Sequence, residues 1–318
     1  MERAVRGRSV LVTGGAGFIG SHLVRALVAD GYAVRVLDNL STGQYARFAG
    51  IERKVDFQEG DIRNAVACRN ASRGVDTVFH LAAYVSVPGS VRDPVTADAI
   101  NISGTLNVLL AARDSGVRRL VFSSSSAVYG DTEVLPTPED TLPKPMSPYG
   151  VEKLYGEQMA RLFSRLYGLE TTCLRYFNVY GPGQNPESEY AAVVPKFITR
   201  MLEGKPPTIF GDGEQTRDFL FVGDVVRANL LAANADKAGG EVFNVAGGSS
   251  TSLNALHSVL AGILGVKKKA EYGPARQGDI LHSSAAVRRA REVLGFTPAH
   301  DLRFGLEKTV EFYRSAAI

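Results

Sequence analysis

Tyr149 and Lys153 have the residue types and the spacing to carry out proton transfer. They are four residues apart in Pro148–Tyr167, where apolar residues recur at helical spacing, so their side chains are expected to share one helix face. A cation beside a phenol favours the phenolate, so we expect Lys153 to lower the pKa of Tyr149 from about 10. A tyrosine with such a pKa can take a proton from a hydroxyl group near neutral pH.

A serine-rich segment supports this interpretation, because the pair alone could be a chance helical pair. Residues 122–130 read FSSSSAVYG, and they overlap the end of a predicted strand, Leu120–Ser123. Hydroxyl groups at the carboxyl end of a strand lie where a parallel sheet binds its ligands. The serines and the tyrosine are therefore candidates for one catalytic group.

A glycine-rich turn near the start of the chain is typical of a dinucleotide site. Residues 10–20 read VLVTGGAGFIG, an apolar run that leads into Gly14, Gly17 and Gly20 and then into helical sequence. Glycine lets the backbone turn sharply and approach a pyrophosphate, while the helix N-terminus offers unpaired N–H groups. An ordinary tight turn would give the same pattern.

Asp38 favours the dinucleotide interpretation. It lies 18 residues after Gly20, at the end of the predicted strand Ala33–Leu37, where a carboxylate can accept from both adenosine ribose hydroxyls. The same charge would repel a 2′-phosphate, so NAD is favoured over NADP. Asp61 and Ile62 follow the next predicted strand and are expected to flank the adenine.

Short β-branched runs alternate with helical sequence through the first half of the chain. This alternation predicts an α/β fold with a parallel sheet covered by helices on both faces. The predicted strands are Ser9–Val12, Ala33–Leu37, Val55–Glu59, Thr77–Leu81 and Leu120–Ser123, and the predicted helices are Ser21–Ala29, Ala97–Ser115 and Pro148–Tyr167.

After about Leu174, glycine- and proline-marked loops separate shorter elements. We expect this part to form a smaller lobe over the carboxyl edge of the sheet. The expected division is residues 1–174 plus about 215–238 for the dinucleotide domain, and about 175–214 and 239–318 for the second lobe.

The composition is that of a soluble globular protein and excludes several classes of function. The 318 residues are 45% hydrophobic and 22% charged, with a net charge of +3, and the longest basic run, Lys267–Lys269, is too short to suggest nucleic acid. Two distant cysteines and five scattered histidines predict no metal site. Arginines precede the apolar run at residue 10 as in a signal peptide, but the glycines there argue against one. No segment approaches about 18 uninterrupted apolar residues, so we expect a cytoplasmic enzyme.

The motifs together resemble the extended short-chain dehydrogenases/reductases that process nucleotide sugars. The resemblance rests on TGGAGFIG, Asp38, FSSSSAVYG and the Tyr149–Lys153 pair, and it runs nearly end to end. It implies a Rossmann-type doubly wound parallel sheet with a smaller, mixed α/β lobe that binds the substrate. It also implies that Tyr149 is the catalytic base, that Ser125 assists it, and that Lys153 holds the nicotinamide ribose.

Residues expected to contact the cofactor lie in the glycine turn, after the following strands and around the catalytic group. They are Gly14, Gly17, Phe18, Ile19, Gly20, Asp38, Asn39, Ser41, Thr42, Gly43, Asp61, Ile62, Leu81, Ala82, Ala83, Ser123, Tyr149, Lys153 and Tyr176.

Segments in the second half resemble the parts of this family that bind UDP. RYFNVYGP contains the asparagine, Asn178, that contacts the diphosphate, which Arg217 and Arg276 would clamp with their planar guanidinium groups. Asp279 would accept from the uridine ribose, and Phe210 would lie by the uracil. The full expected set is Val85, Ser125, Ser126, Asn178, Val193, Phe210, Arg217, Arg276, Asp279 and Ser283.

The positions after Ser125 distinguish reactions within the family. The 4,6-dehydratases carry an Asp-Glu pair there and the UDP-glucuronate decarboxylases a glutamate, whereas this chain has Ser126 and Ala127. UDP-glucuronate 4-epimerases tend to have threonine at the position of Asn178. With nothing to eliminate or decarboxylate, the resemblance implies a UDP-hexose 4-epimerase that forms a transient 4-keto sugar.

The sugar itself stays less defined. Ser86–Pro88, Gln184–Pro186 and Tyr190–Pro195 look most like the enzymes that act on UDP-N-acetylglucosamine, and Ser283 stands where glucose-only enzymes place a tyrosine. Gly183 replaces an arginine that is common in the family. UDP-glucose and UDP-galactose alone are the next interpretation.

Several alternatives remain at this point. A UDP-glucuronate 4-epimerase or decarboxylase, or a 4,6-dehydratase, would need its acidic residue from elsewhere in the chain, and a non-catalytic NAD-sensing protein would not need Ser125, Tyr149 and Lys153 together. The helices Ala97–Ser115 and Pro148–Tyr167 are either coverings of the sheet or, as is common in the family, a four-helix dimer interface. The resemblance favours a homodimer.

Overall fold

The chain folds around a large parallel β-sheet. The computed structural model describes residues 9–186, 192–267, 269–275 and 280–316. Within these residues seven strands form the sheet in the order β11–β6–β5–β4–β1–β2–β3, and each neighbouring pair is parallel. This confirms the predicted α/β class and its doubly wound sheet. The strands are β1 (Ser9–Thr13), β2 (Ala33–Asp38), β3 (Val55–Glu59), β4 (Thr77–His80), β5 (Arg119–Ser125), β6 (Glu170–Tyr176) and β11 (Glu241–Val245).

The strand order puts a topological switch point between β1 and β4. From β1 the chain winds outward to β2 and β3, and it then crosses to β4 on the other side of β1 and continues outward to β5. Ligands of open α/β sheets bind beside the carboxyl ends of the strands at such a point. Leu81 marks this edge, since its N–H donates a 3.1 Å bond to the carbonyl of Thr13.

Helices bury both faces of the sheet. Val10 and Val12 of β1 pack in one core with α1 and α8, whereas Leu11 packs in a second core with α2, α5 and α6. Successive side chains of a strand point to opposite faces, so a strand that is covered twice is apolar throughout. These helices are α1 (Phe18–Ala29), α2 (Ala65–Ser72), α5 (Thr105–Asp114), α6 (Pro148–Tyr167) and α8 (Val222–Asn234).

Residues 94–114 form one long apolar helix. α4 (Pro94–Asp98), a π-helical segment (Ala99–Gly104) and α5 form one helix of 21 residues. It begins three residues before the predicted start because Asp93 caps it, accepting from the N–H of Thr96. Its length and composition alone would let it cross a membrane, but 44% of its most apolar window is buried in the protein. The buried apolar side chains of α5 pack in the same core as α2 and α6.

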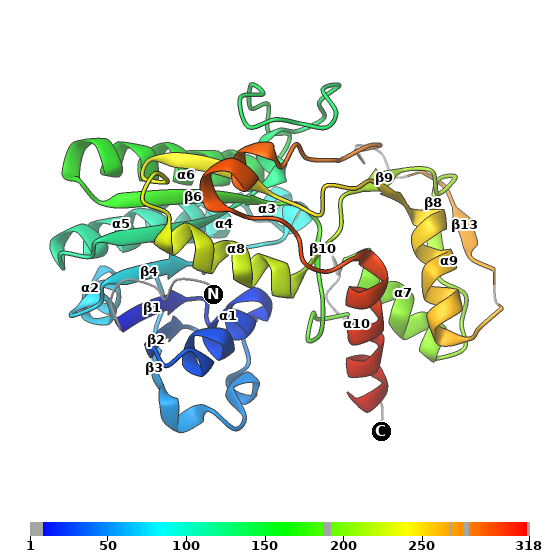
Figure 1. Cartoon of the computed structure of the whole chain (residues 1–318), viewed down its shortest axis with the longest axis horizontal. Helices are drawn as coiled ribbons and strands as arrows, with labels where there is room; N and C mark the ends of the chain where they lie inside the picture. The colour runs from blue at the N-terminus through cyan, green and yellow to red at the C-terminus, as the bar shows by residue number, and fades with distance from the viewer. Residues whose placement is uncertain (1–8, 187–191, 268, 276–279, 317–318) are drawn as a thin grey trace.

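The chain after β6 forms most of a smaller lobe. Figure 1 shows its helices α7, α9 and α10 grouped at the end of the molecule away from α2 and α5. Phe197, Leu256 and Leu306 belong to its own core. The helices are α7 (Val193–Leu202), α9 (Leu253–Leu264) and α10 (Leu302–Ala316), and the strand pairs are β7 (Val179–Tyr180) with β10 (Leu220–Phe221), β8 (Thr208–Phe210) with β13 (Glu271–Gly273), and β9 (Thr216–Arg217) with β12 (Thr251–Ser252).

The position of β11 differs from the predicted division of the chain. Residues from about 239 to 318 were expected in the smaller lobe, but β11 pairs in parallel with β6 at the edge of the large sheet. Val242, Phe243 and Val245 are buried there. The alternation of strands and helices therefore continues after β6 through α8 to β11. The apolar run of β11 is short and did not predict this strand.

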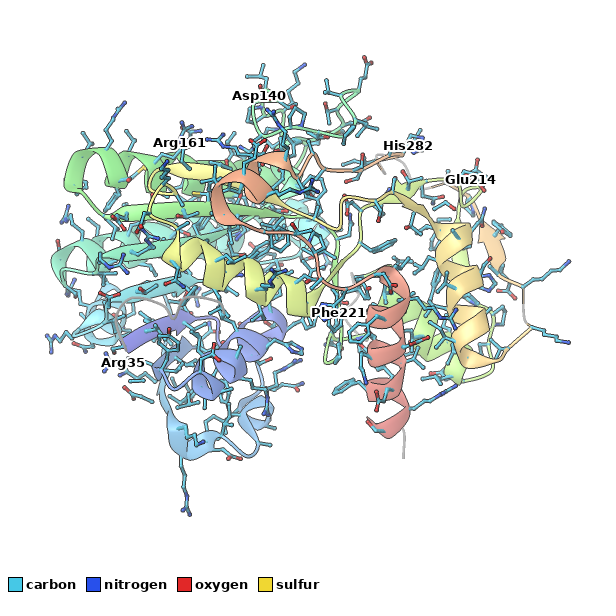
Figure 2. All side chains as sticks on the ribbon, viewed as in Figure 1. Arg35, Asp140, Arg161, Glu214, Phe221 and His282 are labelled. Atoms are coloured by element: carbon cyan, nitrogen blue, oxygen red, sulfur yellow. The ribbon has the colours of Figure 1, made fainter. Side chains whose placement is uncertain are left out.

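An aromatic cluster around Phe221 joins the β7–β10 strand pair to α10 (Figure 2). The centroid of the Phe221 ring lies 6.0 Å from that of Tyr180, 5.3 Å from that of His300 and 5.9 Å from that of Phe304. Aromatic pairs at such separations contribute beyond the area that they bury. The β7–β10 pair and α10 are therefore packed together by large side chains.

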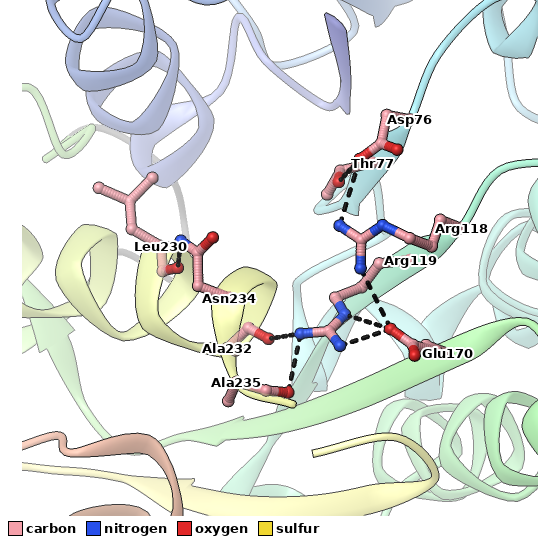
Figure 3. Close-up of polar contacts among 9 residues, drawn as sticks. All are labelled: Asp76, Thr77, Arg118, Arg119, Glu170, Leu230, Ala232, Asn234 and Ala235. Carbon is pink, nitrogen blue, oxygen red and sulfur yellow. Dashed lines mark hydrogen bonds and ion pairs between the residues drawn. The ribbon is translucent and has the colours of Figure 1, made fainter. Parts of the chain in front are cut away.

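A buried arginine holds β5, β6 and α8 together at the amino ends of the strands (Figure 3). Arg119, the first residue of β5, donates to Glu170 through Nε at 3.0 Å and Nη2 at 2.5 Å. Its Nη1 donates to the carbonyls of Ala232 at 3.1 Å and Ala235 at 2.8 Å, at the C-terminus of α8. A cation at this end of a helix satisfies otherwise unpaired carbonyls and complements the helix dipole.

Candidate active site

Tyr149 and Lys153 lie one turn apart on the buried face of α6. Ser147 caps the helix by accepting from the N–H of Gly150, and Pro148 occupies the first turn. Tyr149 is 9% exposed and Lys153 is 4% exposed. Lys153 Nζ lies 5.7 Å from the centroid of the Tyr149 ring and donates a 2.8 Å bond to the carbonyl of Ser123. The shared face that the spacing predicts is present, and it covers the carboxyl end of β5.

Ser125 is the last residue of β5, and its side chain is hydrogen-bonded to the hydroxyl of Tyr149. Ser125 Oγ also accepts from the N–H of Ala127 at 3.2 Å. A hydroxyl has one donor and two acceptor sites, so Ser125 can accept from Ala127 and still donate a proton. The structure therefore brings the three predicted catalytic residues together.

Ser90 and Gly150, which sequence analysis did not single out, fix the position of Tyr149. The buried Ser90 Oγ accepts from the N–H of Tyr149 at 3.1 Å. A Cβ on Gly150 would lie 2.7 Å from the carbonyl oxygen of Ala127, so glycine is needed for α6 to approach the end of β5. The glycine beside the tyrosine was a readable signal, whereas Ser90 lies 59 residues away in the sequence and gave none.

The pKa of Tyr149 departs from the expectation. Burial raises the pKa of the phenol, the hydrogen bond with Ser125 lowers it, and the carboxylate of Glu152 raises it. Burial also lowers the pKa of Lys153 to about 8, although Glu152 and Glu157 act in the opposite direction. The prediction that Lys153 lowers the pKa of Tyr149 is therefore wrong for the protein chain itself, because low-dielectric surroundings disfavour both charged forms.

The turn between β1 and α1 has the geometry of a pyrophosphate site. Gly17 is the N-cap of α1, and the first turn contains no acidic side chain. Because the first N–H groups of a helix have no partner within it, those of Phe18, Ile19 and Gly20 suit an anion. A Cβ on Gly20 would lie 2.8 Å from Gly15 Cα, so the helix packs directly onto the turn.

Asp38 ends β2 and is buried beside this turn. Its Oδ2 accepts from the N–H of Ala16 at 2.9 Å, and its Oδ1 accepts from the N–H of Leu40 at 2.8 Å. Each carboxylate oxygen keeps a further lone pair for a ribose hydroxyl. The predicted cofactor residues that follow Asp38 are Asn39, Ser41, Thr42 and Gly43. Their loop packs tightly against the Asp38 side chain, since a Cβ on Gly43 would lie 2.8 Å from Asp38 Oδ1.

The Asp38→Asn variant is expected to bind NAD about tenfold more weakly, because a charge-assisted hydrogen bond to the ribose is lost. Its affinity for NADP should rise relative to NAD, because the repulsion of a 2′-phosphate is removed. Fluorescence titration with both cofactors measures this ratio, with Asp56→Asn, on the exposed face of β3, as the control. An unchanged NADP-to-NAD ratio in Asp38→Asn would assign the discrimination to another residue.

Asp61 and Ile62 lie after β3, but both are engaged in ways that the sequence did not indicate. Asp61 accepts from Arg63 Nη2 and from Asn39 Nδ2, each at 2.8 Å. The bonds from Arg63 hold the pKa of Asp61 down at about 2. The side chain of Ile62 is 4% exposed and packs on Gly104, whose Cβ would lie 2.7 Å from it. The expected contact of Ile62 with adenine would therefore involve its backbone.

Leu81, Ala82 and Ala83 follow β4 at the switch point. The N–H of Ala82 donates to Thr13 Oγ1 at 3.3 Å, and the same hydroxyl is 2.7 Å from His80 Nδ1. Burial lowers the pKa of His80 to about 3, so this histidine is neutral. The contacts fix the end of β4 beside the glycine turn.

Tyr176 and Ser123, also predicted to contact the cofactor, meet on the opposite side of the switch point. Their side chains are hydrogen-bonded to each other. Tyr176 OH also donates to Asn229 Oδ1 of α8 at 3.0 Å, and burial raises the pKa of Tyr176.

Residues 215–218 connect four of the ten predicted substrate-binding residues, Asn178, Phe210, Arg217 and Ser283. The carbonyl of Thr216 accepts from the N–H of Ser283 at 3.1 Å and from Arg217 Nη1 at 2.9 Å. Gln215 Nε2 donates to the carbonyl of Phe210 at 2.6 Å, and Asn178 Nδ2 donates to that of Asp218 at 3.4 Å. Figure 2 shows the adjoining residues Glu214 and His282 at one end of the smaller lobe.

The remaining predicted substrate residues are more scattered. Val85 is 66% exposed after β4, Ser126 begins a 3₁₀ turn (Ser126–Val128), and Val193 begins α7. Arg276 and Asp279 lie outside the described residues.

Asp218 acts as an anchor that sequence analysis did not identify as one. It is fully buried, and its carboxylate accepts from the N–H of Gly247 at 2.7 Å and of Ala285 at 3.2 Å. Burial raises the pKa of Asp218 to about 6. Neighbours on an extended chain point to opposite sides, so Asp218 turns inward while Arg217 turns the other way.

Fold and site together define a class: an α/β enzyme with a dinucleotide-type turn at the switch point and a Ser–Tyr–Lys group at the carboxyl edge of the sheet. The family described as "NAD dependent epimerase/dehydratase family" matches residues 10–246. The chain belongs to this family, and it is an NAD-dependent enzyme.

Full-length relatives and solved structures agree with this assignment. The UDP-glucose 4-epimerase of Mycolicibacterium smegmatis is 43% identical over 309 residues, which cover 96% of this chain and 98% of that protein. The structure of a UDP-N-acetylglucosamine 4-epimerase from Methanobrevibacter ruminantium, in complex with UDP-N-acetylmuramic acid, superimposes with a TM-score of 0.94 at 39% identity, covering 98% and 99% of the two chains. That of a UDP-glucose 4-epimerase from Thermotoga maritima, with UDP-glucose, gives 0.92 at 44% identity, covering 97% and 99%.

Proposed function

We propose that this enzyme catalyses the 4-epimerisation of UDP-hexoses, acting on UDP-glucose and UDP-galactose and also on UDP-N-acetylglucosamine and its galacto epimer. The observation that carries the proposal is the group formed by Ser125, Tyr149 and Lys153, in which Ser125 is followed in the sequence by Ser126 and Ala127. Neither of these two side chains can act as the general acid of an elimination. A 4-keto sugar formed here can therefore only be reduced again. The similarity to proteins named UDP-glucose and UDP-N-acetylglucosamine 4-epimerases supports this choice.

Each side chain has a defined task in this mechanism. Tyr149 takes the proton of the C4 hydroxyl and later returns it, while Ser125 donates a hydrogen bond to the same oxygen. NAD, when bound, would supply a cationic nicotinamide that favours the phenolate and would serve as acceptor and then donor of the C4 hydride. Lys153 would hold the ribose of the nicotinamide. Asn178 and Arg217 would hold the diphosphate of the substrate while the 4-keto sugar rotates to present its other face.

Product analysis of the wild-type enzyme tests this proposal. Incubation with UDP-glucose or UDP-N-acetylglucosamine should give a mixture of 4-epimers by NMR, with no net reduction of NAD. UDP-glucuronate and dTDP-glucose are the other two substrates to test. A UDP-pentose from the first would identify a decarboxylase, a 4-epimeric uronate a UDP-glucuronate 4-epimerase, and a 4-keto-6-deoxy sugar from the second a dehydratase.

Ser283 carries the proposed use of N-acetylated sugars. It is half-buried, and its N–H is bonded to Thr216 next to Arg217, so its small side chain leaves space beside the proposed diphosphate site. The Ser283→Tyr variant is expected to lose at least about 100-fold in kcat/KM for UDP-N-acetylglucosamine and to retain UDP-glucose turnover within about threefold, because the added ring overlaps only the acetamido group.

Ser283→Ala is the control, since it removes the hydroxyl without filling the space. Both sugars should remain substrates of this variant. Equal losses for the two sugars in Ser283→Tyr would place the specificity elsewhere.

We further propose that the enzyme is a cytoplasmic homodimer. Val151, Leu166 and Tyr167 of α6 are 50%, 61% and 51% exposed, which is unusual for apolar residues of a sheet-covering helix. Pairing of α5 and α6 from two copies would cover them as a four-helix bundle. Both cysteines are buried and unpaired, which fits a reducing compartment. Sedimentation equilibrium tests the dimer, and a monomeric mass at micromolar concentration would contradict it.

A further inference from the structure

Both ends of the β5–β6 strand pair carry an arginine–glutamate contact, but only the one at the carboxyl ends is buried on both sides, since the Glu170 side chain is 43% exposed. At the amino ends, Arg119 and Glu170 lie opposite each other in the ladder and are bonded to each other (Figure 3). At the carboxyl ends, Ser124 lies opposite Arg175, and the carboxylate comes from Glu157 of α6. The two contacts are chemically alike, but only the second lies beside Ser125.

The contact at the carboxyl ends excludes water almost completely. The side chains of Glu157 and Arg175 are 1% and 5% exposed. The carboxylate of Glu157 accepts from Arg175 Nε at 2.8 Å, from Arg175 Nη2 at 2.7 Å and from Ser124 Oγ at 2.5 Å. On its other side the guanidinium lies 4.6 Å from the centroid of the Tyr129 ring. Desolvation makes such a buried pair a weak source of net stability, so stability alone does not explain its presence.

Glu157 lies on the same helix face as the catalytic residues. It follows Lys153 by one turn and Tyr149 by two, and its partner Ser124 directly precedes Ser125. One carboxylate therefore ties the helix that carries the base to the strand that carries the assisting hydroxyl. Ser125 must stay within hydrogen-bond distance of Tyr149, and displacement by about 1 Å can cost about 100-fold in rate.

We propose that Glu157 is a positioning residue of the reaction, which fixes the end of β5 against α6 through Ser124 and Arg175 and adds a fixed negative charge near Lys153. This inference rests on the proposed function. Glu157 acts through Ser125 and Lys153, and within the described residues its hydrogen-bond partners, Ser124 and Arg175, are not among those predicted to bind the nucleotide.

The charge of Glu157 gives the proposal a signature that a merely structural role would lack. Groups that face or influence Lys153 are Tyr149, Glu152 and Glu157 on α6, the Ser123 carbonyl and Phe122 ring on β5, the neutral His80 on β4, and Arg175 on β6, which partly offsets Glu157. Removal of one carboxylate from this set lowers the pKa of Lys153 further. The loss of activity at high pH should then begin at a lower pH.

The experiment compares Glu157→Gln with Glu170→Gln in the NAD-loaded enzyme. Glu157→Gln is expected to lower kcat at least about tenfold, leave KM for UDP-glucose within about twofold, and move the high-pH limb of kcat to lower pH. Glu170→Gln removes the same group from the opposite end of the same strand pair. It should leave kcat and the pH profile unchanged, although it also lowers the melting temperature.

Ser124→Ala decides the question if Glu157→Gln does not fold, because it removes one hydrogen bond and keeps the ion pair. A severalfold loss of kcat at unchanged KM is expected. A wild-type kcat in Ser124→Ala, an unmoved pH limb in Glu157→Gln, or an equal loss of kcat in Glu170→Gln would each overturn the proposal. Tyr149→Phe, assayed in parallel, separates this failure from that of the proposed function. An inactive Tyr149→Phe enzyme leaves the proposed mechanism standing when the other variants contradict the role of Glu157, whereas an active one contradicts the mechanism and, with it, this inference.

Discussion

Replacement of Tyr149 by phenylalanine is expected to lower kcat by at least about 10³-fold while the protein keeps its NAD. General acid–base catalysis by one side chain contributes about 10² to 10⁴ in rate, and no other described phenol is bonded to Ser125. The phenylalanine keeps the aromatic ring of residue 149, which packs at the carboxyl end of β5, so the fold should be unaffected. Turnover of UDP-glucose and the absorbance of NAD released on denaturation measure the two quantities.

Tyr167→Phe is the matched control for this prediction. It removes a phenol from the far end of α6, where the side chain is 51% exposed and its ring carries Arg113. This variant should have wild-type kcat. If Tyr149→Phe also retained full activity, the proton would have to be moved by a different group, and the proposed mechanism would be wrong.

The pKa of Tyr149 could not be predicted from the sequence alone. Helical spacing correctly predicted that Tyr149 and Lys153 share a face, because that depends only on the periodicity of the helix. It could not predict that both side chains are more than nine-tenths buried, since burial is set by β5 and by the short helix α3 (Val87–Arg92), which both pack on α6. Burial outweighs the expected effect of the cation and raises the pKa of the phenol. The local sequence pattern therefore predicts to which face of the helix the two side chains point, whereas tertiary packing determines their pKa values.

The same distinction separates the predicted from the unpredicted parts of the fold. The strand Val55–Glu59 and the helix Pro148–Tyr167 were predicted with their observed bounds, because an apolar run and the helical spacing of apolar residues are local signals. The place of β11 beside β6 was not, since it depends on a pairing 69 residues apart in sequence, as between Glu241 and Thr172. The role of Asp218 as a buried anchor was not predicted either, because its partners, Gly247 and Ala285, lie on two later segments of the chain.

Gly14→Ala is expected to abolish stable NAD binding and to destabilise the protein by several kcal/mol. Gly14 adopts a φ of +70°, which costs an L-residue about 1–2 kcal/mol. Its Cβ would also lie 2.6 Å from Ala82 N and 2.9 Å from Leu81 C, which are backbone atoms that no side-chain rotation can move. Relief of this contact separates the ends of β1 and β4 at the switch point and displaces the N-terminus of α1. Denaturant unfolding and the NAD content of the purified protein measure the two effects.

Gly31→Ala separates the cost of the backbone conformation from that of the contact. Gly31 has a φ of +83° just after α1, but a Cβ there would meet nothing within 4 Å. This variant should lose only about 1 kcal/mol and keep its NAD, since it carries the conformational penalty alone. The difference between the two variants is then the energy of forcing β1 and β4 apart. If Gly14→Ala behaved like Gly31→Ala, the edge between these strands would be pliable, and the close approach of Gly14 to Ala82 could not be what shapes the pyrophosphate site.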